Sequence, residues 1–326
     1  MTEAYRIAMR ETGGPEVLER EPLGKLAPGD GELLIRNEAI GLNFIDTYYR
    51  SGLYPTPLPS GLGNESAGIV EATGEGVEGF RPGDRVGVFS GPLGAYATHR
   101  IVAAERAVKL PDAIGSEVAA AAMLKGCTAE FLIERCARVE PGQTVLVHAA
   151  AGGVGSILVP WLKAIGARVI AHAGSPAKAQ QAREAGAEEA LSCPMEELAA
   201  QVRALTDGKG VPIVLDGVGA ASWEASLQST ARRGLIVTYG NASGPVPPFT
   251  PLDLVRAGSL FVTRPTLFDY IATPDEMRAS AARLFEMIGS DAVPVRIGAR
   301  YPLSDAAEAH RALESRNTTG STLLIP

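Results

Sequence analysis

Residues 148–155 read HAAAGGVG, and this stretch, together with the patterns before and after it, indicates the fold of this part of the chain. Gly152 and Gly155 hold the second and third glycine positions of a G-x-G-x-x-G pattern, with Ala150 in the first. The apolar run TVLVHAA (144–150) precedes it, as a buried strand would, and a helical pattern follows it. A helix N-terminus offers free N–H groups and a positive dipole end, so this order of elements predicts a phosphate-binding turn. The alternative is a turn of small residues with no ligand.

The pattern of strand and helix continues beyond this turn. Six strands alternate with helices over about 120 residues, which is typical of a doubly wound parallel sheet in an α/β fold. We expect strands at 144–150, 168–174, 189–193, 211–219, 234–241 and 259–265, with helices at 152–167, 176–187, 195–206 and 221–230 between them.

The first third of the chain has a different character. It is rich in short strands and turns, such as GELLIRNEAIGLN (31–43), with a tight turn at RPGD (81–84). The last segment, GSTLLIP (320–326), is strand-like but too small for a domain, so we expect it to return to the first one. The predicted division is therefore a β-rich domain of 1–125 with 266–326, and a cofactor domain of 126–265.

The end of the second predicted strand indicates which dinucleotide binds. Dinucleotide folds that use NAD place an acid there to bond the ribose 2′-hydroxyl. Residues 171–178 read AHAGSPAK and contain no acid. Ser175 and Lys178 offer a hydroxyl and a charge to a 2′-phosphate instead, which favours NADPH. For Lys178 alone, a place on a solvated helix face is the simpler interpretation.

Composition limits the other function classes. The 326 residues are 46% hydrophobic and 21% charged, with a formal net charge of -7, which argues against nucleic acid as a partner. The three cysteines (127, 136 and 193) are isolated, and no apolar run is long enough to span a membrane. We therefore expect a cytoplasmic protein that does not associate with membranes.

Several stretches together resemble one protein family, the zinc-independent NADPH:quinone oxidoreductases. These are relatives of zeta-crystallin in the medium-chain dehydrogenase/reductase superfamily, and the resemblance runs essentially end to end. The stretches are NFIDTYYRSGLYP (43–55), GNESAGIV (63–70), HAAAGGVG (148–155), VTYGNASG (237–244), VTRPTL (262–267) and PLSDAAEAHRALESRNTTGSTLLIP (302–326).

The resemblance implies an architecture as well as a reaction. It implies a GroES-like catalytic domain built from the N-terminal part and the C-terminal tail, a Rossmann cofactor domain inserted between them, and an active cleft where the two meet. It also implies a homodimer in which the last cofactor-domain strands, SLFVTRP (259–265), pair edge to edge.

The resemblance also implies the site residues. Asn43, Asp46, Tyr48 and Arg264 would be catalytic, and Tyr54 would line the pocket, although half-buried packing explains either tyrosine equally well. The residues implied to contact NADPH are Asn43, Phe44, Tyr48, Lys125, Thr128, Gly152, Gly153, Val154, Gly174, Ser175, Lys178, Tyr239, Gly240, Asn241, Thr263, Arg264 and Arg316. Two positions depart from the family pattern: Cys193 replaces a tyrosine, and Gly217 replaces a serine or threonine.

Zinc can be assessed on chemical grounds. Related alcohol dehydrogenases bind catalytic zinc with a Cys and a His, in the segments that match GLNFID and GNE, where this chain has Asn43 and Asn64. Zinc needs thiolate, imidazole or carboxylate ligands in tetrahedral geometry, and Asp46 with Glu65 does not provide such a set. We therefore expect no metal.

The leading hypothesis is an NADPH-dependent reductase of quinones, because a quinone is electrophilic without a Lewis acid and needs mainly correct placement. The alternative enzyme is an enoyl or alkenal reductase that delivers hydride to an activated C=C bond. A crystallin-like structural role or RNA binding is the third hypothesis, against which the acidic composition weighs.

Overall fold

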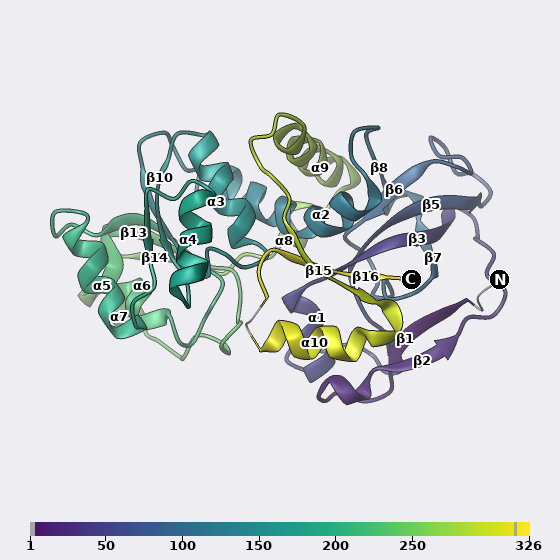
Figure 1. The fold of residues 1–326 in the computed structure, drawn as a ribbon, viewed down its shortest axis with the longest axis horizontal. Helices are drawn as coiled ribbons and strands as arrows, with labels where there is room; N and C mark the ends of the chain where they lie inside the picture. The colour runs from purple at the N-terminus through teal and green to yellow at the C-terminus, as the bar shows by residue number, and fades with distance from the viewer. Residues whose placement is uncertain (1–3, 316–317) are drawn as a thin grey trace. The chain divides into compact units, whose positions relative to one another are not determined.

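The computed structural model describes residues 4–315 and 318–326. The chain forms two compact units. Unit 1 comprises Met1–Cys127, Ile271–Gly289 and Val295–Pro326, and unit 2 comprises Thr128–Tyr270 and Ser290–Pro294 (Figure 1). The sequence predicts domain boundaries between residues 125 and 126 and between residues 265 and 266. The division into a catalytic and a cofactor domain at these boundaries stays a prediction.

Unit 2 is built on one six-stranded sheet in which all neighbours are parallel. Its order is β11-β10-β9-β12-β13-β14, so the chain starts in the middle, winds to one edge and then to the other. This is the doubly wound arrangement that the sequence predicts, and its ligands bind at the carboxyl ends of the strands. The strands are β9 (Thr144–Val147), β10 (Arg168–His172), β11 (Glu189–Leu191), β12 (Val211–Asp216), β13 (Thr230–Thr238) and β14 (Phe261–Thr263).

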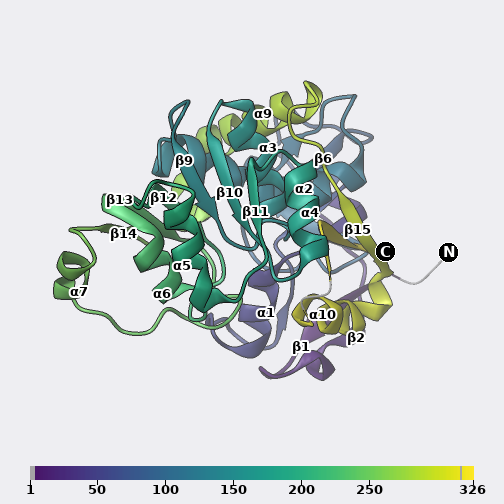
Figure 2. The same ribbon diagram turned by 60° about the vertical axis from the view of Figure 1, so that its left-hand side comes forward.

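Helices cover this sheet because its strands are apolar on both faces. Helix α3 packs on β9 and β10, α4 on β10 and β11, and α6 on β12 and β13. Figure 2 shows β9, β10 and β11 side by side with α4 beside them. The helices are η3 (Phe131–Cys136), α3 (Gly155–Ala164), α4 (Pro176–Glu184), α5 (Met195–Ala204), α6 (Trp223–Ser229), α7 (Pro251–Arg256) and α8 (Leu267–Tyr270).

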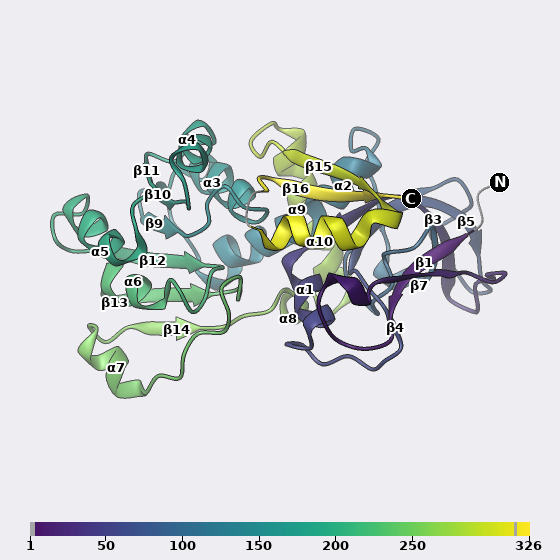
Figure 3. The ribbon, with the colours of Figure 1, turned by 60° about the horizontal axis from the view of Figure 1, so that its bottom comes forward.

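Unit 1 contains a larger, mostly antiparallel sheet and a small one. The larger sheet has the order β15-β16-β3-β5-β6-β8, with β7 also on β3, and the small sheet is β2-β1-β4. The C-terminal strand β16 pairs with β3, so the tail of the chain joins the N-terminal fold. Figure 3 shows β15 and β16 running beside α10.

The elements of unit 1 follow in chain order, and α2 carries the chain on into unit 2. They are β1 (Tyr5–Met9), η1 (Pro15–Val17), β2 (Glu19–Pro22), β3 (Glu32–Leu42), α1 (Phe44–Ser51), β4 (Ser60–Gly61), β5 (Glu65–Thr73), β6 (Arg85–Val88), β7 (His99–Ala103), η2 (Ala104–Arg106), β8 (Val108–Lys109), α2 (Ser116–Glu130), α9 (Pro274–Gly289), β15 (Ile297–Pro302), η4 (Leu303–Asp305), α10 (Ala306–Glu314) and β16 (Ser321–Ile325).

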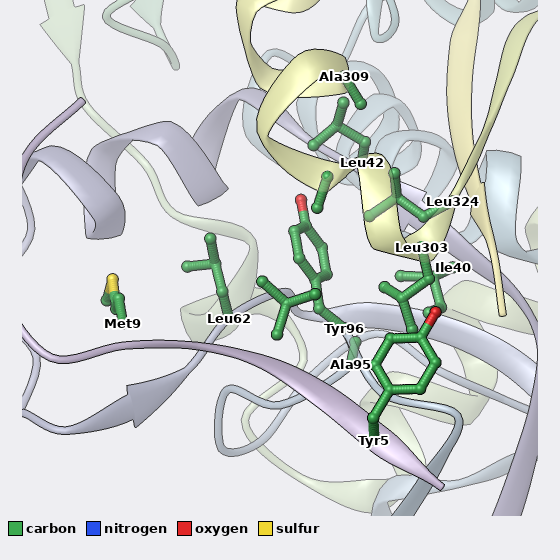
Figure 4. Packing of buried hydrophobic residues seen from close by; sticks show 12 residues of the cluster. Tyr5, Met9, Ile40, Leu42, Leu62, Ala95, Tyr96, Leu303, Ala309 and Leu324 are labelled. Carbon is green, nitrogen blue, oxygen red and sulfur yellow. The ribbon is translucent and has the colours of Figure 1, made fainter. Parts of the chain in front are cut away.

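One core of unit 1 lies where β1, β3 and α10 meet. Tyr96 stands within it, fully buried among aliphatic side chains such as Leu42, Leu62 and Ala309, and its hydroxyl points toward α10 (Figure 4). A buried hydroxyl needs a hydrogen-bond partner, so this core must also contain polar groups. Among the described residues, no helix is long and apolar enough to cross a membrane.

Candidate active site

Asn43 stands at the junction between a strand and a helix. Strand β3 ends at Leu42 and α1 begins at Phe44, and Asn43 has the extended backbone of an N-cap residue (φ −128°, ψ 151°). Three residues on, Asp46 Oδ2 accepts a hydrogen bond of 2.9 Å from the backbone N–H of Asn43. This is the return bond of a capping box, so the Asp46 carboxylate holds the Asn43 backbone in place.

Asp46 is completely buried and accepts two further hydrogen bonds. Its Oδ1 accepts from Asn64 Nδ2 at 3.2 Å and its Oδ2 from the Tyr96 hydroxyl at 2.9 Å. Burial raises the pKa of Asp46 to about 6, while its hydrogen bonds and the charge of Lys125 act in the opposite direction. Asp46 is therefore a carboxylate at neutral pH and titrates just below it.

Tyr96 links Asp46 to a chain of polar groups on α10. Its hydroxyl lies 3.0 Å from His310 Nε2, and His310 Nδ1 lies 2.9 Å from Arg50 Nη1. Arg50 also donates to both carboxylate oxygens of Glu314, at 2.7 and 3.0 Å. Burial, and then the charge of Arg50, lower the pKa of His310 to about 3, so the imidazole stays neutral.

Glu65 forms a second buried carboxylate beside the first. Its Oε1 accepts from the backbone N–H of Leu124 at 2.7 Å, and its Oε2 accepts from Asn43 Nδ2 at 2.8 Å. The Nζ of Lys125 lies 3.5 Å from the same Oε2. Burial raises the pKa of Glu65, and the charge of Lys125 opposes the rise. A Cβ at Gly41 would lie 2.2 Å from Oε2, so a glycine there leaves room for this carboxylate.

These contacts orient the Asn43 amide. Its Nδ2 donates to Glu65 Oε2 and, at 3.3 Å, to the carbonyl oxygen of Gly41, which uses both N–H groups. The side-chain polar atom with capacity left is the carbonyl oxygen Oδ1, which can only accept. Asn43 can therefore bind a donor such as a carboxamide NH₂, but it has no N–H group left to polarise a substrate carbonyl.

The predicted aromatic residues form a cluster at α1. The ring of Tyr48 lies 6.1 Å from Phe44 and 5.2 Å from Tyr54, measured between centroids, and Tyr54 also packs edge-on against Tyr49. Tyr48 is 8% exposed. Tyr48 and Tyr54 therefore pack against neighbouring aromatic rings, as the alternative interpretation of the sequence predicts. A catalytic role for Tyr48 stays a prediction.

In unit 2, the HAAAGGVG stretch forms the turn between β9 and α3. The left-handed residue there is Ala149 (φ 49°), and Ala150 is not among the residues with positive φ, so alanine suffices at the first motif position. A Cβ at Gly155 would lie 2.3 Å from the Ala149 carbonyl oxygen, which is why that position needs glycine. None of the described residues accepts a hydrogen bond from the N–H of Gly153 or Val154, so this turn fits a pyrophosphate.

The loop after β10 contains the predicted 2′-phosphate ligands. Ser175 is the N-cap of α4, and its Oγ accepts a 3.3 Å hydrogen bond from the backbone N–H of Lys178. Partial burial lowers the pKa of the Lys178 amine. A Cβ at Gly174 would meet nothing within 4 Å, so there is open space at this position of the loop. A 2′-phosphate site formed by Ser175 and Lys178 stays a prediction.

The remaining predicted contacts follow other strands of unit 2. Arg264, after β14, is exposed and donates from Nη1 to the carbonyl oxygen of Pro265 at 3.0 Å. Arg316 lies outside the described residues. Thr128 begins unit 2 on α2, Tyr239, Gly240 and Asn241 follow β13, and Thr263 ends β14.

One buried network of unit 2 was not predicted. Asp216, at the end of β12, accepts hydrogen bonds from the hydroxyls of Ser222 and Ser226, and Ser226 Oγ lies 3.0 Å from His148 Nε2. His148 precedes the phosphate turn, so this network ties the turn to the neighbouring strand. The signal in the sequence was a charged residue at the end of an apolar strand, in VPIVLDGVG.

The structure thus brings together one predicted group, Asn43 with Asp46 and Lys125, in unit 1. It adds Glu65, Tyr96 and His310, which sequence reasoning missed as site residues. Glu65 was considered only as a metal ligand, and Tyr96 and His310 are far apart in sequence, with no motif to connect them.

The donor set beside Asn43 does not fit zinc. Asn43 directs its amide nitrogen at Glu65, and an ammonium, that of Lys125, already lies 3.5 Å from the Glu65 carboxylate. Among residues 4–315 and 318–326, no three His, Cys, Asp or Glu side chains are grouped so that they could hold a metal. Zinc sites need at least three such ligands, so these residues do not provide a zinc site.

Two family models match the chain. The alcohol dehydrogenase GroES-like domain matches residues 29–112, and the model described as zinc-binding dehydrogenase matches residues 153–286. The first confirms the GroES-like fold expected for the β-rich part, and the second covers the five strands of the parallel sheet that follow β9.

Full-length relatives are similar over the entire chain. A quinone oxidoreductase of Pseudomonas aeruginosa is 50% identical over 99% of this chain and 100% of its own length. A 2-haloacrylate reductase of a Burkholderia species is 38% identical over 98% of each chain. The solved structure of Escherichia coli quinone oxidoreductase complexed with NADPH is 46% identical, with a TM-score of 0.97 over 99% of this chain and 100% of that one. A mycobacterial protein complexed with NADPH is 49% identical, with a TM-score of 0.95 and the same coverage.

Proposed function

The chain belongs to the quinone oxidoreductase family of the medium-chain dehydrogenase/reductase superfamily, and from this membership we propose that it is an NADPH-dependent reductase of quinones. The observation that carries the proposal is the agreement between the residues of the site and those expected for the family. A turn that fits a pyrophosphate lies in unit 2, and a polar site without a set of zinc ligands lies in unit 1. Relatives named as quinone oxidoreductases are 46–50% identical over 99% of the chain.

The residues of unit 2 bind the cofactor in this proposal. The N–H groups of Gly153 and Val154 hold the pyrophosphate at the N-terminus of α3. Ser175 and Lys178 hold the 2′-phosphate, by a hydroxyl and by a charge respectively. NADPH, when bound, supplies a hydride. The preference for NADPH over NADH then depends on Lys178.

The residues of unit 1 orient the reacting groups. Asn43 Oδ1 accepts a hydrogen bond from the nicotinamide carboxamide, because both of its N–H groups are already used by Gly41 and Glu65. Asp46 fixes the backbone of Asn43 and is a positioning residue. Tyr48 also lines the site of unit 1, while Arg264, a residue of unit 2, contacts the cofactor near its phosphates. Correct placement of an electrophilic quinone removes much of the barrier without a Lewis acid.

A second reaction has a specific observation in its favour. A relative 38% identical to this chain is named 2-haloacrylate reductase, an enzyme acting on an activated C=C bond. Measured values of kcat/KM with 1,4-benzoquinone, an α,β-unsaturated aldehyde and 2-chloroacrylate separate the two reactions. We expect the quinone to have the highest value. Turnover of the alkenes alone would overturn the quinone assignment.

The same family membership supports a homodimer. Strand β14 is an edge of the sheet and pairs only with β13 among the described strands. Phe261, the first residue of β14, is 64% exposed, and Val255 on α7 is 60% exposed, which is costly for a free surface. We propose that β14 of a second copy covers this edge. Light scattering should give twice the chain mass for the native protein, and Phe261→Asp should give a monomer; a native monomer would contradict the proposal.

A further inference from the structure

Lys125 is a buried cation inside the site of unit 1. It belongs to α2, and its side chain is 5% exposed. The nearest carboxylate is Glu65, whose Oε2 lies 3.5 Å from Nζ. Lysine is almost never buried in proteins unless it is paired, so its position here requires an explanation.

The pairing with Glu65 leaves donors of the ammonium unused. The group has three N–H donors and no acceptor of its own. No described residue accepts a hydrogen bond from Lys125 Nζ in good geometry. A buried donor without an acceptor is destabilising, and more so when it is charged. A catalytic role is one reason why native proteins keep such a group.

The unused donors lie next to the residue that orients the nicotinamide in the proposed function. Glu65 Oε2 receives the Asn43 amide at 2.8 Å and faces Lys125 Nζ at 3.5 Å, so one carboxylate oxygen connects the two groups. The ammonium of Lys125 therefore lies beside the side chain that orients the nicotinamide in the proposed function.

The N–H groups of the Asn43 amide and the carboxylate of Asp46 are already occupied within the network. Asn43 has used both N–H groups of its amide. Asp46 accepts from three donors, namely the Asn43 backbone, Asn64 and Tyr96. Lys125 is the member of this network that is both charged and short of acceptors.

We propose that Lys125 is a catalytic residue that binds the oxygen of the acceptor and gives it the proton which completes reduction. The proposal rests on the proposed function. A quinone that receives a hydride gains two electrons and one proton and becomes a hydroquinone monoanion. As the second O–H bond forms, an N–H bond of Lys125 breaks, and the neutral amine regains its proton from water. Glu65 holds the ammonium in place.

The first test removes the ammonium of Lys125, once alone and once together with the charge of Glu65. Lys125→Met alone leaves Glu65 as an unpaired buried carboxylate, so the double variant Lys125→Met/Glu65→Gln is made as well. Lys209→Met, at an exposed lysine, is the matched control. We expect both Lys125 variants to lose at least about 100-fold in kcat/KM for 1,4-benzoquinone, since general acids contribute about 10²–10⁴-fold. The loss should remain in kcat at saturating NADPH, so that weaker binding of the cofactor does not account for it.

The second test restores a proton donor from solution. In Lys125→Ala, added methylamine or ethylamine should recover part of the lost rate, more so for the smaller amine, whereas a purely structural lysine would give no recovery. A third readout does not use turnover. With NADP⁺ bound, 4-nitrophenol should bind the native protein as its yellow phenolate, a stand-in for the hydroquinone monoanion, and should lose that form in Lys125→Met.

The outcomes separate the two proposals. If the native protein turns over alkenals but no quinone, the proposed function fails. The Lys125 variants are then tested with the alkenal, because its reduction forms an enolate that also needs a proton. If the native protein reduces quinones and folded Lys125 variants keep their rate, the Lys125 proposal is wrong. It is also wrong if those variants weaken NADPH binding and leave kcat unchanged, because Lys125 is then only a contact of the cofactor, as the family resemblance implies.

Discussion

The guanidinium of Arg50 donates a hydrogen bond of 2.9 Å to Nδ1 of His310, 260 positions away in the sequence. Arginine has only donors, so Nδ1 must accept, and the proton of the neutral imidazole is on Nε2. His310 then donates to the Tyr96 oxygen, and Tyr96 donates to Asp46. Arg50 therefore sets the direction of every hydrogen bond in this series, and the last bond is accepted by Asp46. Asp46 is thereby held as a carboxylate that positions Asn43.

Removing the Tyr96 hydroxyl should change the pH dependence of the enzyme. The pKa of Asp46 is about 6, and the hydrogen bond from Tyr96 lowers it. Below this pKa Asp46 is protonated and loses its hold on Asn43, so kcat/KM should fall on the acid side. In Tyr96→Phe the acid limb should move up by about one pH unit, since a hydrogen bond to a charged group contributes about 1.5–3 kcal/mol.

The stability linked to Asp46 should vary with pH in the opposite sense. The pKa of about 6 lies above the ordinary value of 3.8, so the folded state binds the proton more tightly than the unfolded chain. The stabilising contribution is complete below the ordinary pKa and is lost as pH rises through about 6. Asp46→Asn should lack both the acid limb of kcat/KM and this contribution in denaturant unfolding. An unchanged acid limb in Asp46→Asn would show that another group titrates.

His310 should contribute to stability more than any exposed ion pair. His310→Phe leaves the Tyr96 hydroxyl without its donor and removes an acceptor from Arg50, both in the buried core. We expect the free energy of unfolding to fall by about 2–3 kcal/mol. Glu117→Gln, which breaks the exposed pair with Arg300 at 2.6 Å, is the control and should cost less than about 1 kcal/mol. Equal losses in urea unfolding would refute the assigned network.

Lys178 should decide between the two nicotinamide cofactors. Lys178→Ala should raise the dissociation constant for NADPH about 10- to 100-fold, the value of a charge-assisted hydrogen bond. Binding of NADH, which has no 2′-phosphate, should change less than about threefold on the same scale. Fluorescence titration measures both. A parallel loss for the two cofactors would place Lys178 on the helix face that the sequence left as the alternative.

Gly217 should be intolerant of a side chain. A Cβ there would lie 2.8 Å from ring atoms of Tyr239, which occupies the space that a serine or threonine would need. Gly217→Ala should lower the free energy of unfolding by about 1–3 kcal/mol through overpacking. Tyr239→Ala in the same chain should relieve the strain, so the double variant should be more stable than the sum of the two changes indicates. Additive losses would mean that the two residues do not compete for space.

Local signals predicted the sheet of unit 2 well, and they failed on the polar site. The order of strand, turn and helix around Gly152 depends on residues close in sequence, so its pattern is visible there. The network of Asp46, Tyr96 and His310 depends on three segments that only the fold brings together. The role of Asn43, which the family resemblance implies, also depends on the fold, because Glu65 sets the orientation of its amide.

Stopped-flow measurement of NADPH oxidation by 1,4-benzoquinone tests whether the protein reduces quinones without a metal. The protein is first treated with a chelator and freed of bound metal, and one equivalent of NADPH is then mixed with the quinone. We expect that NADPH is consumed, that one hydroquinone forms per NADPH, and that deuterium at C4 of the nicotinamide slows the step. If NADPH stays unoxidised with the quinone, or is consumed only after zinc is added, the protein is not a metal-independent quinone reductase.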